Sequence, residues 1–102
     1  MKAAFLGLLI LAATSAASAA EVRIKDYKFV PEKVTVKVGE TVKWTNDEKR
    51  ASHSIWFKSE GLPESERMLN GDSWERKFDK PGTYPYTCGP HPEMKGLVVV
   101  VE

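Results

Sequence analysis

The segment TCGPHPEM, residues 87–94, gathers side chains that bind soft metal ions. It contains the only cysteine of the chain, one of its two histidines and one of its three methionines, at Cys88, His91 and Met94. Two residues separate each donor from the next, so one tight loop can bring all three to a single ion. A proline on either side of His91 restricts the loop before any ion binds, because proline fixes φ. The spacing therefore predicts a preorganised metal site.

The second histidine completes a recognisable ligand set. His53 falls in a segment that we predict to be a strand, and with Cys88 and His91 it supplies two imidazole nitrogens and one thiolate. Together with a weak axial thioether, these are the ligands of a trigonal blue-copper centre. Met94 is the axial candidate, since Met68 competes with it on residue type but not on spacing. We therefore predict one type 1 copper per chain.

Each of these residues also has an ordinary structural interpretation. A single histidine on a strand is usually a core or surface residue, and a lone cysteine or methionine usually packs in a core. Structural zinc sites usually recruit four Cys or His ligands, and iron–sulfur clusters need more cysteines. A catalytic cysteine–histidine dyad fits the residue types, yet nothing in the sequence marks a third orienting group or an oxyanion hole. The combination of donors favours copper binding without enzymatic activity.

The N-terminus has the pattern of a secretory signal peptide. Lys2 precedes an apolar run and then a series of small residues. We predict cleavage after Ala19 or Ala20, which removes residues 1–20 and leaves residues 21–102 as one small domain. The apolar run is short for a membrane span, and an uncleaved N-terminal anchor is the alternative.

The charge and the cysteine content of the exported domain exclude some classes of function. The whole chain has a formal net charge of +1, and Lys2 is the only charged residue in the predicted signal peptide. The mature domain is therefore neutral, which argues against nucleic acid as a partner. A lone Cys88 cannot form an internal disulfide, and an exposed free thiol outside the cytoplasm is prone to oxidation. We expect a periplasmic protein whose cysteine sulfur is occupied.

The remaining sequence is typical of short strands. Apolar and polar residues alternate with a period of two, which indicates half-buried strands. We expect strands over residues 22–29, 34–38, 42–45, 53–57, 74–78, 84–86 and 97–101, the last buried on both faces. Residues 58–70 should form a loop with one helical turn around residues 64–67. About seven strands without an amphipathic helix predict a single all-β sandwich domain.

The sequence resembles the cupredoxins, the small blue-copper proteins of plastocyanin and azurin type, over essentially the whole mature chain. The resemblance lies in VTVKVGETVKWTN at 34–46, His53, FDKPGTYPYTCGPHPEMKG at 78–96, and the terminal LVVVVE. The short Cys-x2-His-x2-Met loop is most similar to that of the amicyanins. The resemblance implies an eight-stranded Greek-key β-sandwich with copper at one end, and it carries the ligand roles onto His53, Cys88, His91 and Met94.

The resemblance also implies an electron carrier rather than an enzyme. Copper would alternate between Cu(I) and Cu(II), and electrons would pass between periplasmic proteins. A donor dehydrogenase or cytochrome and an acceptor cytochrome or reductase are the expected partners of a monomer. Docking at the exposed edge of His91 would be weak and transient. The alternative is a periplasmic copper-binding protein for copper delivery or resistance, built on the same fold.

Ser54 departs from the family pattern. The residue after the first histidine ligand is commonly Asn, whose backbone N–H points at the cysteine sulfur and whose side chain braces the ligand loop. Here we expect the backbone contact to survive and the shorter serine hydroxyl to rebuild the brace, with Thr87 as the expected partner. The spacing of Asn46 gives no reason to assign it that role.

Overall fold

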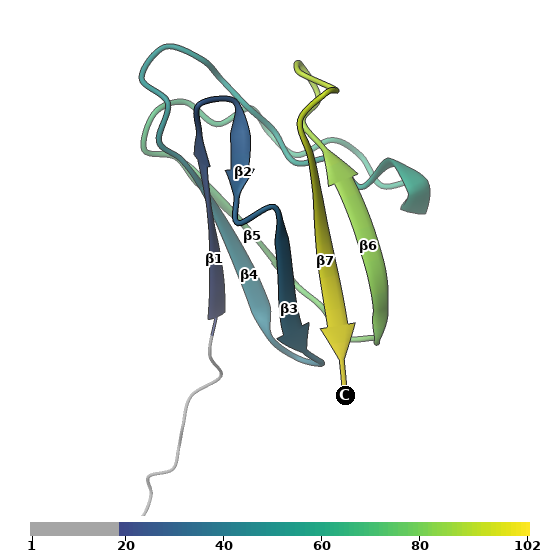
Figure 1. Cartoon of the computed structure of the whole chain (residues 1–102). Coiled ribbons are helices and arrows are strands. Elements are labelled where there is room, and N and C mark those ends of the chain that lie inside the picture. Colours follow the sequence, from purple (N-terminus) through teal and green to yellow (C-terminus); the bar gives the residue numbers. More distant parts are fainter. Residues whose placement is uncertain (1–18) are drawn as a thin grey trace, which may run out of the picture.

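Two β-sheets pack face to face around a hydrophobic core (Figure 1). The computed structural model describes residues 19–102, so all but the last two residues of the predicted signal peptide lie outside the described residues. The described part of the chain forms seven strands in a single domain, which confirms the predicted all-β sandwich. Within it, no helix is both long and apolar enough to cross a membrane.

The first sheet contains four strands in the order β2-β1-β4-β5. Their bounds are Lys28–Val30 for β2, Ala19–Lys25 for β1, Thr41–Asn46 for β4 and Ser73–Lys77 for β5. β1 runs antiparallel to β2 and parallel to β4, and β4 runs antiparallel to β5. Val42, Trp44 and Asn46 of β4 point into the core. The alternation predicted for this strand is therefore confirmed.

The second sheet contains three strands in the order β3-β7-β6. Their bounds are Lys33–Lys37 for β3, Lys95–Val101 for β7 and Gly82–Thr87 for β6. The central strand β7 buries Val98 and Val100, whereas Leu97 and Val99 are only partly buried. The prediction that this strand is buried on both faces is wrong, because in a two-layer sandwich the second face of each strand is the outer surface.

The strand predicted over residues 22–29 is in fact two strands joined by a tight turn. Asp26 and Tyr27 have φ of 53° and 58°, in the left-handed region. Two such residues in succession are typical of a type I′ hairpin turn. The usual Asn-Gly signal is missing, so no local sequence pattern marks this turn. The hairpin places Tyr27 at the same end of the sandwich as the loop after β6 (Figure 1).

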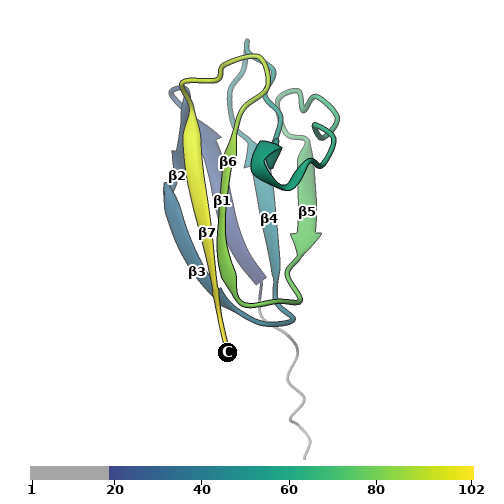
Figure 2. The ribbon, with the colours of Figure 1, turned by 90° about the vertical axis from the view of Figure 1, so that its right-hand side faces the viewer.

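The strand predicted over residues 53–57 is also wrong. This segment belongs to the long connection between β4 and β5 and makes two isolated bridges, from His53 to Met68 and from Trp56 to Thr87. Much of the connection between β4 and β5 lies towards the end of the sandwich that carries the loop after β6, opposite the C-terminus (Figure 2). The described chain accordingly has seven strands, not the eight that the resemblance implied.

The helical turn in this connection lies earlier than predicted. It is the 3₁₀ turn η2, Lys58–Glu60, and Gly61 ends it with φ of 71°. Ser65, where the helical turn was expected, pairs instead with Ile55. The Ile55 N–H donates to the Ser65 hydroxyl at 2.8 Å, and the Ser65 N–H donates to the Ile55 carbonyl at 2.9 Å. These contacts with a distant segment prevent a local helix.

Asn46 holds the chain between β4 and His53. Its buried side-chain amide donates to the carbonyls of Ala51, at 3.0 Å, and Met68, at 2.8 Å. Its side-chain oxygen accepts the Glu48 N–H at 2.8 Å. A buried side chain with three such bonds gives an irregular segment a defined path. Asn46 therefore positions the histidine, a role that its spacing did not reveal.

An aromatic cluster joins the two sheets below this end. Trp44 of β4 donates its indole N–H to the Tyr86 hydroxyl of β6 at 3.0 Å, and their rings meet edge to face at 5.4 Å. Phe57 packs against both rings, at 6.1 Å and 5.2 Å between centroids. All three side chains are buried. The cluster therefore anchors β6 two residues before Cys88.

Replacing Tyr86 with Phe is expected to destabilise the protein by about 1–3 kcal/mol, because the buried Trp44 N–H loses its acceptor. Urea unfolding of the protein without added metal measures the change. Tyr84→Phe is the matched control, since the Tyr84 hydroxyl donates to the exposed carbonyl of Lys80 and water can replace it. Equal losses in the two variants would contradict the assigned role of the buried bond.

Candidate metal centre

Three donor atoms converge at the end of the sandwich. Nδ1 of His53, Sγ of Cys88 and Nδ1 of His91 belong to a group whose ligand atoms all lie within 4.8 Å of one another. The Cys88 sulfur is 3.5 Å from the His53 nitrogen and 3.7 Å from the His91 nitrogen. His53 and Cys88 are fully buried, whereas His91 is partly exposed. The structure thus brings together residues that are 35 positions apart.

The spacing between these atoms fits a metal ion. An ion about 2.0 Å from a nitrogen and about 2.3 Å from a sulfur, with a trigonal angle of about 120°, requires a separation of about 3.7 Å. The two observed sulfur–nitrogen distances are 3.5 and 3.7 Å. A soft thiolate with two imidazoles suits copper on chemical grounds. The donor set therefore fits the copper centre that the sequence predicts.

The ligand loop between β6 and β7 is closed by its own backbone. Cys88 directly follows β6, and its N–H donates to the Met94 carbonyl at 3.2 Å. The Met94 N–H in turn donates to the His91 carbonyl at 2.9 Å. With prolines at positions 90 and 92, these bonds restrict the loop. Three of the predicted ligands therefore sit on one constrained turn.

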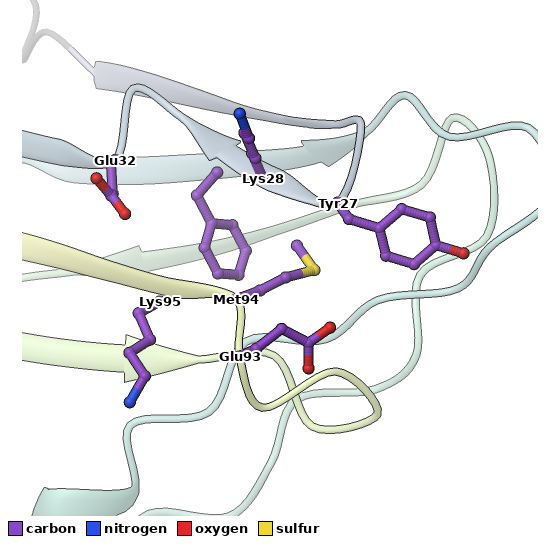
Figure 3. Close-up of a pocket in the computed structure, with 7 residues that line it drawn as sticks. Tyr27, Lys28, Glu32, Glu93, Met94 and Lys95 are labelled. Carbon is purple, nitrogen blue, oxygen red and sulfur yellow. The ribbon is translucent and has the colours of Figure 1, made fainter.

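Met94 is buried at the edge of this site. Figure 3 shows its side chain leaving the ligand loop in the direction of Tyr27, beside a pocket of about 390 Å³. The pocket is lined by Tyr27, Lys28, Phe29, Glu32, Glu93, Met94 and Lys95. Both lysines and both glutamates border it, so the charge of its lining is mixed. Since Glu93 and Met94 belong to the ligand loop, the pocket borders that loop directly.

Tyr27 and Glu48 enclose the two histidines. The Tyr27 ring meets His53 and His91 edge to face, with centroids 5.4 Å and 4.8 Å away. The Glu48 carboxylate accepts the Tyr27 N–H at 2.7 Å and lies 3.5 Å from His53 Nε2. The carboxylate therefore faces the ring nitrogen opposite the converging Nδ1, although Nε2 forms no hydrogen bond among the described residues. Neither contact was predicted, because no sequence pattern links the three segments.

Burial controls the protonation of the donors. Burial lowers the pKa of His53, and nearby His91 lowers it further, although Glu48 opposes both effects. Burial also raises the pKa of Cys88, and hydrogen bonds from backbone N–H groups only partly oppose this. The site thus favours a neutral imidazole and a protonated thiol when it holds no metal. Since thiolate is the ligand form, a bound ion must displace the thiol proton.

The backbone of Ser54 contacts the cysteine as expected, but its hydroxyl bonds other groups than the predicted Thr87. Its N–H donates to the Cys88 sulfur at 3.4 Å. Its hydroxyl accepts the Gly89 N–H at 2.9 Å and lies 2.5 Å from the Glu64 carboxylate. The predicted bond to Thr87 is wrong, because the Thr87 hydroxyl is buried without a hydrogen-bond partner among the described residues.

Comparisons with known proteins agree with this geometry. Residues 16–101 match the family described as copper binding proteins, plastocyanin/azurin family. An amicyanin-alpha from Methylorubrum extorquens is 42% identical over 88 residues, covering 82% of this chain and 73% of the relative. A plastocyanin from Scenedesmus fuscus is 40% identical over 84 residues, covering 71% and 85%.

A solved structure shows the same fold. A reduced Cu(I) form of an amicyanin variant at pH 4 superposes with a TM-score of 0.76 at 36% identity, covering 89% of this chain and 90% of that one. The likeness extends over nearly the whole described chain and includes both sheets. The cupredoxin resemblance of the sequence is therefore confirmed, and the chain belongs to the plastocyanin/azurin family of copper-binding proteins.

Proposed function

We propose that this protein is a type 1 copper electron carrier in which His53, Cys88 and His91 hold the metal and Met94 is the axial ligand. The observation that carries the proposal is the convergence of the ligand atoms of His53, Cys88 and His91 within 4.8 Å, with the sulfur 3.5 and 3.7 Å from the two Nδ1 atoms. Family membership and the amicyanin and plastocyanin relatives support one type 1 copper and an electron-transfer function. Amicyanin and plastocyanin are electron carriers rather than enzymes, which supports a carrier here.

Copper, when bound, supplies a one-electron couple between Cu(I) and Cu(II). The protein keeps the donors in place. His53 and Cys88 are fully buried, and the loop that carries His91 is closed by backbone hydrogen bonds. Donors that cannot move far need little rearrangement when the charge of the ion changes. The buried sulfur is also shielded from water and from oxidants.

His91 is the proposed electron port. It is partly exposed, whereas the other two donors are fully buried. Tyr27, which packs on it, is 49% exposed. A monomer with this small exposed face would bind redox partners weakly and release them quickly. We place the protein in the periplasm after removal of residues 1–20, with a dehydrogenase or cytochrome as donor and a cytochrome or reductase as acceptor.

Adding Cu(II) to the metal-free protein is expected to produce an intense blue or green colour from the Cys88–copper bond. Cys88→Ala should lose this absorption completely, because no other thiolate exists in the chain. Visible and electron paramagnetic resonance spectra measure the effect. A Cys88→Ala variant that retained the colour would exclude the ligand assignment.

Substituting each of the two buried methionines, Met68 and Met94, shows which one is the axial ligand and which one only fills the core. Met94→Leu should retain the intense absorption but raise the reduction potential, because the weak axial donor favours Cu(II). Met68→Leu, a matched buried change, should leave the potential unaltered. Voltammetry of both variants measures the difference. If the potential moved only in Met68→Leu, Met68 and not Met94 would be the axial ligand.

The delivery alternative makes a different forecast. A carrier should cycle reversibly at an electrode and keep its copper in both oxidation states. A delivery protein should stay colourless, bind Cu(I) alone and pass it to a chelator. The buried cysteine and closed loop favour the carrier, because release would require opening both. Rapid loss of Cu(I) to a chelator, without reversible voltammetry, would favour delivery.

A further inference from the structure

A line of polar contacts runs from the candidate site to the surface of the β4–β5 connection. The Gly89 N–H donates to the Ser54 hydroxyl at 2.9 Å, and that hydroxyl lies 2.5 Å from Oε2 of Glu64. The same Oε2 accepts the Nε–H of Arg67 at 2.8 Å. The four groups are therefore joined through two shared oxygen atoms.

The direction of each hydrogen bond follows from the chemistry of the groups. A backbone N–H can only donate, so the Ser54 hydroxyl must accept from Gly89. Its single hydrogen is then available for the Glu64 carboxylate. The hydrogen bond from Arg67 lowers the pKa of Glu64, and the bond from Ser54 lowers it further, so this carboxylate is an ionised acceptor. The hydroxyl thus has a defined orientation with a charged group behind it.

Ser54 forms hydrogen bonds with two consecutive residues of the ligand loop. Its backbone N–H reaches the Cys88 sulfur at 3.4 Å, and its hydroxyl reaches the N–H of the next residue, Gly89. A Cβ at position 89 would overlap both the Ser54 hydroxyl and the Glu64 carboxylate. The loop backbone therefore lies directly against this pair.

We propose that Glu64 is a positioning residue for the candidate copper site, acting through Ser54 to hold Gly89 and the cysteine beside it. We call the hydrogen bond between Ser54 and Gly89 the brace. The Glu64 carboxylate fixes the orientation of the serine hydroxyl in this brace. This role deepens the proposed function and depends on it for the copper measurements only. The effect of Glu64 on the Gly89 N–H can be tested in the metal-free protein.

A surface ion pair alone does not account for this arrangement. Glu64 and Arg67 have side chains 26% and 53% exposed, and an exposed ion pair of this kind contributes little to stability. Ser54, by contrast, is fully buried. Removal of the Glu64 carboxylate would leave this hydroxyl without a charged acceptor in a buried position. The loss should therefore exceed that of an exposed ion pair, and it should appear at the loop that this hydroxyl holds.

Amide hydrogen exchange at Gly89, followed by NMR in the metal-free protein, tests the proposal. Glu64→Ala should speed exchange by about tenfold or more, as expected for losing a charge-assisted bond. Ser54→Ala should have a similar effect, and Glu64→Gln, which keeps an acceptor oxygen, should restore part of the protection. Glu66→Ala is the matched control, because it removes the same charge from an exposed position in the same segment.

The copper-loaded protein provides a second readout. Glu64→Ala and Ser54→Ala should shift the cysteine–copper absorption and weaken copper binding by about tenfold to a hundredfold, the usual range for groups behind a ligand. Glu66→Ala should change neither quantity. Competition with a chelator and visible spectra measure the two effects.

The two proposals fail differently. Wild-type protein that binds copper without the blue spectrum would refute the electron-carrier function, while faster Gly89 exchange in Glu64→Ala would still support the brace. Gly89 exchange that is equal in Glu64→Ala and Glu66→Ala would refute the brace, whatever the colour of the protein. Glu64→Gln, the milder change, serves for the same comparison if the alanine variant unfolds.

Discussion

Two backbone hydrogen bonds between Trp56 and Thr87, of 2.9 and 3.0 Å, determine the arrangement of the candidate metal centre. They join an irregular segment between β4 and β5 to the end of β6, so they connect the two sheets. Thr87 immediately precedes Cys88, and Trp56 follows His53 and Ser54 by three and two residues. The bridge therefore brings an imidazole and a backbone N–H to the sulfur. Without it, the cysteine and the distant histidine would belong to separate loops.

Burial of the donors is the second constraint, and it explains why so many polar contacts surround them. A buried polar group is unfavourable unless it has a partner. The Ser54 N–H partly satisfies the Cys88 sulfur, and the Glu48 carboxylate faces the outer nitrogen of His53. An ion between the three donors would satisfy the remaining lone pairs. These contacts also restrict the donors, which suits a carrier that must change charge with little movement.

The family resemblance predicts the donor residues of the site better than the groups that contact those donors. His53, Cys88 and His91 lie together, yet the group behind Cys88 is a serine with a carboxylate that lies ten residues further along the chain. The Ser54 hydroxyl bonds the loop directly at Gly89, and Glu64, which orients that hydroxyl in our proposal, comes from a different part of the connection. A property that depends on this brace, such as the reduction potential, belongs to this chain and does not follow from the family.

The amino-acid sequence by itself determined the sandwich class, the strands β3 to β7 and the identity of the candidate ligands. Local alternation and spacing carry that information, because a strand has a period of two and a metal loop has a fixed span. Only the tertiary structure decided that residues 22–29 form a hairpin, that residues 53–57 make isolated bridges, and that Ser54 binds Gly89 and Glu64. Each of these features depends on hydrogen bonds between segments, or on a turn without its usual residues. Such contacts have no periodic signature in the sequence, since the partners meet only when the two sheets close around the core.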